Sequence, residues 1–167
     1  MRTLYVCRHA KSSWADGSIS DHDRPLNERG SRDAPLMARE FRARKEHVDL
    51  LVSSTALRAI TTAQAFAHEL GYDPGSIHQS TALYHADVPT LMQVITGLPG
   101  NASSVMLFGH NPGLTYLLDH LTDAGVDNLP TCGLVRIDME IDDWQAVSRS
   151  IGTQRWYDHP KRHAGHG

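Results

Sequence analysis

The chain has 167 residues, which suits one α/β domain with a sizeable core and leaves too little for a second. Its 16 basic and 19 acidic residues are interspersed and give a formal net charge of -3, which argues against nucleic acid or a membrane surface as a partner. No run approaches the roughly 18 to 20 apolar residues of a membrane span, and the N-terminus lacks a signal-peptide profile. The two cysteines lack metal-site spacing, and Cys7 falls in an apolar run, so a disulfide framework is not indicated and we expect a cytoplasmic protein in a reducing compartment.

Four short apolar runs are predicted to form strands, and helical patterns separate them. The runs at 4–7, 48–52 and 105–108 are typical of buried parallel strands. The run at 134–141 alternates apolar residues with Arg136, Asp138 and Glu140. This is the pattern of a strand with one face exposed to solvent. We expect it to be an antiparallel strand at or near the edge of the sheet.

Four segments space their apolar residues as one face of a helix does. Their stripes are Ala34, Met37, Ala38 and Phe41; Ala56, Ile60, Ala63 and Ala67; Val88, Leu91, Met92 and Ile95; and Leu114, Leu117, Leu118 and Leu121. Asn27 is expected to cap the first helix, and Pro89 and Pro112 to open the last two. The order of elements predicts a three-layer α/β/α sandwich with a mostly parallel central sheet, formed by residues 1–157 as a single domain.

Residues 158–167 are polar and lack apolar periodicity. They include His159, His163 and His166, which could in principle chelate a metal. A flexible C-terminal tail is the better interpretation of this composition.

Basic side chains follow three of the predicted strands. Arg8 and His9 come directly after the first strand, Arg58 stands just beyond the second, and His110 ends the third. Because ligands of open α/β sheets bind beyond the carboxyl ends of the strands, these groups predict an anion pocket, and a phosphoryl group fits it.

Each of these residue types suits a role in phosphoryl transfer. Arg8 and Arg58 can each grip two phosphate oxygens, although a surface ion pair is the commoner fate of an arginine. Arg58 falls in the first turn of its helix, where a cation is unfavourable unless an anion compensates it. His110 can donate to a phosphate oxygen, and His9 can be a nucleophile when its attacking nitrogen is unprotonated.

The segments around these residues resemble the histidine phosphatase superfamily, and in particular its SixA-type phosphohistidine phosphatases. The matching segments are 4–10 (LYVCRHA, with alanine in place of the usual glycine), 23–30 (DRPLNERG), 52–59 (VSSTALRA) and 109–113 (GHNPG). The resemblance implies a phosphorylated intermediate on His9 and phosphate contacts from Arg8, Arg58 and His110. It also suggests a contact from Arg24, for which a structural ion pair is an equally good interpretation.

The proton donor is the weakest part of the resemblance, because SixA-type proteins have no obvious counterpart of the carboxylic acid of larger relatives. His85 and Asp87 are the local candidates, although Asp87 is better explained as a helix cap. A phosphoramidate needs a strong acid less than a phosphate ester does, since its leaving nitrogen can be protonated before the bond breaks. A weak acid site therefore favours phosphohistidine.

The leading hypothesis is a phosphatase for a phosphohistidine-bearing protein that needs no metal or other cofactor. A phosphatase for a small phosphomonoester with the same His9 chemistry is the nearest alternative. A phosphoprotein-binding module without turnover is an alternative from another class, and a metal hydrolase lacks ligand spacing. The sequence leaves the physiological substrate and the oligomeric state open.

Overall fold

A six-stranded sheet organises the chain, with its strands in the order β3-β2-β4-β1-β5-β6. The computed structural model describes residues 1–123 and 125–163. The strands are β1 (Arg2–Arg8), β2 (Leu50–Ser54), β3 (His78–Ser80), β4 (Ser104–Gly109), β5 (Leu134–Met139) and β6 (Gly152–Asp158). β1, β2, β3 and β4 pair in parallel, and β5 is antiparallel to both of its neighbours.

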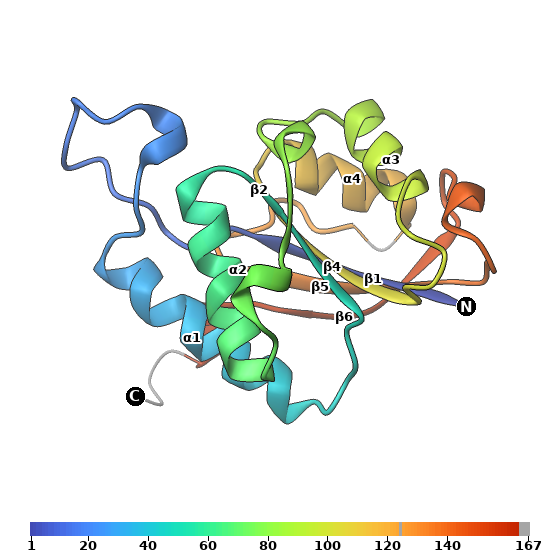
Figure 1. Cartoon of the computed structure of the whole chain (residues 1–167). Helices are drawn as coiled ribbons and strands as arrows, with labels where there is room; N and C mark the ends of the chain where they lie inside the picture. The colour runs from blue at the N-terminus through green and yellow to red at the C-terminus, as the bar shows by residue number, and fades with distance from the viewer. Residues whose placement is uncertain (124, 164–167) are drawn as a thin grey trace.

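Two pairs of helices cover the two faces of this sheet (Figure 1). α1 (Glu28–Ala43) and α2 (Leu57–Leu70) pack on one face, where Phe41, Phe66 and Phe108 share a core. α3 (Val88–Thr96) and α4 (Gly113–Leu121) pack on the other face, with Leu91 and Leu117 in the second core. The predicted three-layer sandwich is therefore confirmed.

The predicted helix starts are also confirmed. The side chain of Asn27 caps α1 by accepting a 2.9 Å hydrogen bond from the Gly30 N–H. Pro89 stands in the first turn of α3, and Pro112 directly precedes α4. At position 30 only glycine fits, because a Cβ would lie 2.1 Å from the backbone oxygen of Lys11. α1 can therefore begin directly against the loop that follows β1.

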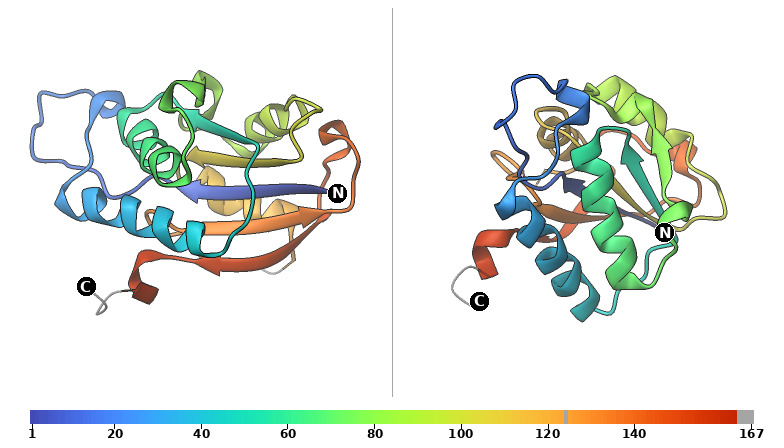
Figure 2. Two further views of the ribbon diagram at one scale, coloured as in Figure 1. Left: turned by 60° about the horizontal axis from the view of Figure 1, so that its bottom comes forward. Right: turned by 60° about the vertical axis from the view of Figure 1, so that its left-hand side comes forward.

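The edge of the sheet differs in one respect from the expectation. β5 is antiparallel and near the edge, as predicted, but β6 covers it and forms the edge itself (Figure 2). The side chain of Asp138, expected on a solvent-exposed face, is buried. It accepts hydrogen bonds from Arg155 of β6 and from Thr3, each at 2.9 Å. Polar side chains along β6 and its lack of an apolar stripe explain why the sequence did not predict this strand.

The first residues of the expected tail pack against the domain. Asp158 ends β6, so the boundary expected after residue 157 falls inside a strand. Pro160–His163 form a 3-10 turn, in which His163 Nε2 lies 3.0 Å from Asp158 Oδ1. His166 and the other residues of 164–167 lie outside the described residues.

Within residues 1–123 and 125–163, none of the helices combines the length and the apolar character needed to cross a membrane. Cys7 and Cys132 are both buried and both free.

Candidate active site

The structure brings the four predicted basic residues together at the carboxyl ends of β1, β2 and β4. Arg8 and His9 leave β1, His110 leaves β4, and Arg58 lies in the first turn of α2 after β2. The three strands are neighbours, and the long loop after β1 projects beyond the same edge (Figure 1). A cavity of about 250 Å³ opens here. It is lined by Arg8, His9, Lys11, Ser12, Trp14, Asp21, Arg24, Arg58, His85, His110, Asn111 and Thr131.

The ring of His9 is held with one nitrogen available for chemistry. His9 is buried, and its Nδ1 lies 2.7 Å from the backbone oxygen of Ala10. A carbonyl oxygen only accepts, so the neutral ring carries its proton on Nδ1 and keeps a lone pair on Nε2. The Ala10 peptide is itself fixed, because its N–H donates to Thr62 Oγ1 at 2.9 Å. The local structure therefore orients the ring and selects its tautomer.

Burial and neighbouring cations keep His9 neutral. Desolvation is the main cause, and the charges of Arg58 and Arg8 add to it, so the pKa of His9 falls from 6.5 to about 4. The Ala10 hydrogen bond opposes this fall but does not cancel it. Near neutral pH the imidazole is therefore unprotonated, the form that a nucleophile requires.

This pKa predicts that His9 destabilises the fold as the pH falls. Unfolded His9 takes up a proton near pH 6.5, whereas folded His9 takes it up only near pH 4, so acid favours the unfolded chain in that window. We expect about 2 kcal/mol of the free energy of unfolding to be lost between about pH 7 and about pH 5 through His9 alone. Urea unfolding of the wild type and of His9→Gln, which cannot titrate, measures this loss. Equal losses in both proteins would contradict the assigned pKa.

Arg58 is buried and Arg8 is half-buried, and their guanidinium groups lie near each other without full pairing. Arg8 donates to the backbone oxygen of Leu129 at 3.0 Å, and Arg58 donates to the backbone oxygen and Oδ2 of Asp21 at 2.6 and 3.1 Å. Among the described residues, neither Nε has a partner. Burial lowers the pKa of Arg8, and the charge of Arg58 lowers it further. An anion bound between the two arginines would supply hydrogen-bond acceptors for the unpaired nitrogens and would offset the repulsion between the two positive charges.

His110 also keeps a buried nitrogen unpaired within the described residues. Its Nε2 lies 2.8 Å from Ser54 Oγ, while Nδ1 has no hydrogen-bond partner there. Its ring centroid lies 5.2 Å from that of His9. Burial lowers the pKa of His110 far below its ordinary value, and His9 and Arg58 act in the same direction. His110 is therefore a neutral hydrogen-bonding group beside His9.

Arg24 forms the ion pair that was one of the two interpretations of the sequence, and it also lines the cavity. It is buried in the cavity wall, where it donates to Ser12 Oγ at 2.7 Å and forms an ion pair with Asp21 at 3.0 Å. Its guanidinium also lies 3.5 Å from the ring centre of the exposed Trp14. The ion pair with Asp21 is therefore present, and the guanidinium of Arg24 stands beside the cavity that contains His9.

Asp21 is the site residue that the sequence analysis missed. It belongs to a 3-10 turn, Asp21–Asp23, and its carboxylate contacts Arg24, Arg58, Tyr84 and His85. Asp21 stands three residues before Arg24, and this spacing within one helical turn was the available signal.

The two candidate proton donors are in different situations. His85 lines the cavity, and its Nε2 lies 2.9 Å from Asp21 Oδ2. Asp87 lines a neighbouring hollow instead, and its Oδ1 caps α3 by accepting from the Thr90 N–H at 3.0 Å. Hydrogen bonds with Thr90 lower the pKa of Asp87. The structure therefore brings His85, and not Asp87, into the cavity with His9.

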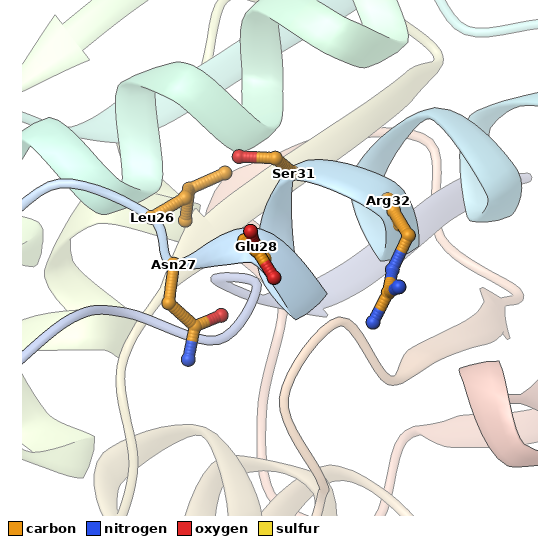
Figure 3. Close-up of a pocket in the computed structure, with 5 residues that line it drawn as sticks. All are labelled: Leu26, Asn27, Glu28, Ser31 and Arg32. Carbon is orange, nitrogen blue, oxygen red and sulfur yellow. The ribbon is translucent and has the colours of Figure 1, made fainter.

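A larger hollow lies elsewhere, at the start of α1, and Figure 3 shows the side chains around it. Its volume is about 560 Å³, and it is lined by Leu26, Asn27, Glu28, Ser31 and Arg32. This lining contains one cation, one carboxylate and no imidazole, so it offers neither a histidine nucleophile nor enough positive charge to bind a phosphate dianion. In the described part of the chain, no group of three histidine, cysteine or acidic side chains is arranged to hold a metal ion.

Comparisons with known proteins identify the family and the fold of the chain. The sequence model of the histidine phosphatase superfamily (branch 1) matches residues 4–84. An uncharacterized protein of Mycobacterium tuberculosis is 37% identical over 137 residues, covering 76% of this chain and 83% of that protein. A SixA structure from Agrobacterium tumefaciens, provisionally assigned as a phosphohistidine phosphatase, is 29% identical, with a TM-score of 0.79 over 95% of this chain and 98% of that one. A second SixA structure, 22% identical and complexed with tungstate, shares the fold at a TM-score of 0.81 over 96% of this chain and 98% of that one. The chain therefore belongs to the histidine phosphatase superfamily.

Proposed function

We propose that the chain is a phosphatase that removes a phosphoryl group from a phosphohistidine side chain of another protein. In the first step, His9 Nε2 attacks phosphorus and the bond to the leaving nitrogen breaks. In the second step, water attacks the phosphorylated His9 and releases orthophosphate. The observation that carries this proposal is the buried His9 ring, whose Nδ1 lies 2.7 Å from the Ala10 carbonyl oxygen and whose Nε2 has no hydrogen bond within the described residues.

The unpaired nitrogens around His9 support the same assignment. In the proposed complex, Arg8 and Arg58 neutralise the charge that spreads over the phosphoryl oxygens, the role that metal ions have in other phosphatases. Ser54 Oγ accepts from the Ala56 N–H at 3.2 Å, and we assign its own proton to the 2.8 Å contact with His110 Nε2, so that neutral His110 carries its proton on Nδ1. His110 Nδ1–H then donates to a phosphate oxygen, and Arg24 provides a further contact.

The shape of the site favours a protein substrate over a small metabolite. The cavity holds about 250 Å³, and its wall includes Trp14, which is 73% exposed. Tyr116, also exposed, lines the neighbouring hollow, and the exposed Leu57 is the first residue of α2. A side chain presented by a protein can enter such a site while its backbone contacts the exposed apolar groups.

A substrate panel tests the proposal. The purified chain is offered a phosphohistidine peptide, sugar phosphates and nucleotide monophosphates, and released orthophosphate is measured. We expect kcat/KM to be highest for the phosphohistidine peptide, because its leaving nitrogen needs little acid assistance. Turnover of monoesters alone would replace the proposal by a small-molecule phosphatase. Tight binding of a phosphopeptide without any turnover would indicate a recognition module.

A further inference from the structure

Asp21 and His85 form a hydrogen-bonded pair on the wall of the cavity that contains His9. His85 Nε2 lies 2.9 Å from Asp21 Oδ2, and the His85 ring centroid is 5.1 Å from that of His110. Within the described residues, His85 Nδ1 has no hydrogen bond. We propose that His85, positioned by Asp21, is the proton donor and acceptor of the reaction. This inference rests on the proposed function.

The position of His85 between two cavities supports this role. The cavity around His9 adjoins a hollow of about 210 Å³ beside α3 and α4, and both are lined by His85 and Asn111. A phosphoryl group in the first cavity can extend its leaving group into the second, so the bond that breaks lies near these two residues. The Asn111 amide is already bonded to Asn128, Leu129 and Thr115. His85 is therefore the ionisable side chain at the junction.

The backbone holds His85 in a conformation that a non-glycine residue rarely adopts. Its φ angle is 51°, in the left-handed region. The next residue, Ala86, packs so closely on α4 that a Cβ at Gly113 would lie 2.1 Å from the Ala86 oxygen. The Tyr84 ring lies 4.2 Å from the His85 ring, centroid to centroid. Strained residues of this kind persist where the surrounding packing fixes them, often at functional sites.

Asp21 suits a positioning role and cannot be the proton donor itself. Burial alone would raise the pKa of its carboxyl, but hydrogen bonds from Tyr84 and His85 and the charge of Arg58 hold the pKa well below its usual range. Asp21 is therefore ionised at any working pH. An ionised carboxylate that accepts from Nε2–H fixes the orientation of the imidazole and leaves Nδ1 for the substrate.

The proton transfers balance over the two steps. As His9 Nε2 bonds to phosphorus and the leaving group departs, protonated His85 gives its Nδ1 proton to the leaving atom. Neutral His85 then takes a proton from the attacking water on Nδ1, as the new oxygen–phosphorus bond forms and the bond to His9 breaks. Orthophosphate leaves, and His85 is again protonated.

A series of leaving groups tests this role. We expect His85→Ala to lower kcat/KM by about 10²-fold or more for phenyl phosphate and by less than about tenfold for dinitrophenyl phosphate, whose leaving group needs no proton. Asp21→Asn should show the same dependence on leaving group added to a uniform loss, because Asp21 also holds Arg58 and Arg24. Added imidazole should partly restore His85→Ala on phenyl phosphate. With a phosphohistidine peptide, the first step should change less, while the phosphorylated enzyme should persist longer.

Two matched variants serve as controls, and thermal melting checks the folding of every variant. Asp23→Asn alters the exposed neighbouring carboxylate of the same 3-10 turn, and Asp87→Asn alters the rival carboxylate while keeping an oxygen to cap α3. Both should keep the wild-type dependence on leaving group. An equal loss across the series in His85→Ala, without imidazole rescue, would refute the proposed role of His85. Failure of the wild type to label His9 would instead refute the proposed function.

Discussion

Replacing His9 by alanine is expected to lower kcat by about 10⁴-fold or more for every phosphorylated substrate. The proposed intermediate forms on His9 Nε2, whereas His110 and His85, the other imidazoles that line the cavity, both have their Nε2 in a hydrogen bond. His110 is bonded through Nε2 to Ser54, and His85 through Nε2 to Asp21. Steady-state release of orthophosphate measures the effect, with the variant first shown to fold by thermal melting.

His78→Ala is the matched control for this prediction. His78 is an exposed residue of β3, at the far edge of the sheet from β1, and should be replaceable without effect on kcat. A His9→Ala protein that retained near wild-type kcat would mean that His9 is not the nucleophile.

Arg58→Lys is expected to lower kcat/KM by about 10²- to 10³-fold, although the charge is kept. Arg58 is 2% exposed and uses two of its guanidinium nitrogens to hold the backbone oxygen and the carboxylate of Asp21. The planar guanidinium of Arg58 can donate to Asp21 and to a phosphoryl oxygen at the same time. A lysine ammonium is a point charge on a flexible alkyl chain and cannot replace this geometry. The loss should appear with a good leaving group as well as a poor one.

Arg42→Lys is the control for the arginine variant. Arg42 lies on the surface of α1 and pairs with Glu69 of α2 at 3.2 Å, an exposed pair that contributes little. Its replacement should leave kcat/KM unchanged. An unchanged kcat/KM in Arg58→Lys would show that transfer of the phosphoryl group does not depend on the planar guanidinium of Arg58.

The placement of Arg8, His9, Arg58 and His110 could be predicted from the sequence because each follows a buried strand. Apolar runs identify parallel strands, and parallel strands bring their carboxyl ends to one edge regardless of the distance along the chain. The structure confirms that these residues meet there. Their catalytic roles remain predictions that the variants above test.

Asp21 could not be predicted in the same way, because it lies in a loop and not at the end of a strand. Its contacts with Arg58 and His85 join residues 37 and 64 positions apart and depend on how the 3-10 turn folds back over α2. β6 was missed for a related reason. Its strand is stabilised by pairing with β5 and by ion pairs such as that between Arg155 and Asp138, which leave no apolar signature in the sequence.

The central claim is that phosphate passes through His9, and trapping the intermediate tests it most directly. The wild type is mixed with a phosphohistidine peptide or dinitrophenyl phosphate carrying labelled phosphorus, quenched in denaturant at alkaline pH, digested and analysed by mass spectrometry. We predict label on the peptide that contains His9, stable in base, lost in acid, and missing from His9→Ala. Turnover of either substrate with no label on His9, or with equal label in His9→Ala, would contradict the account.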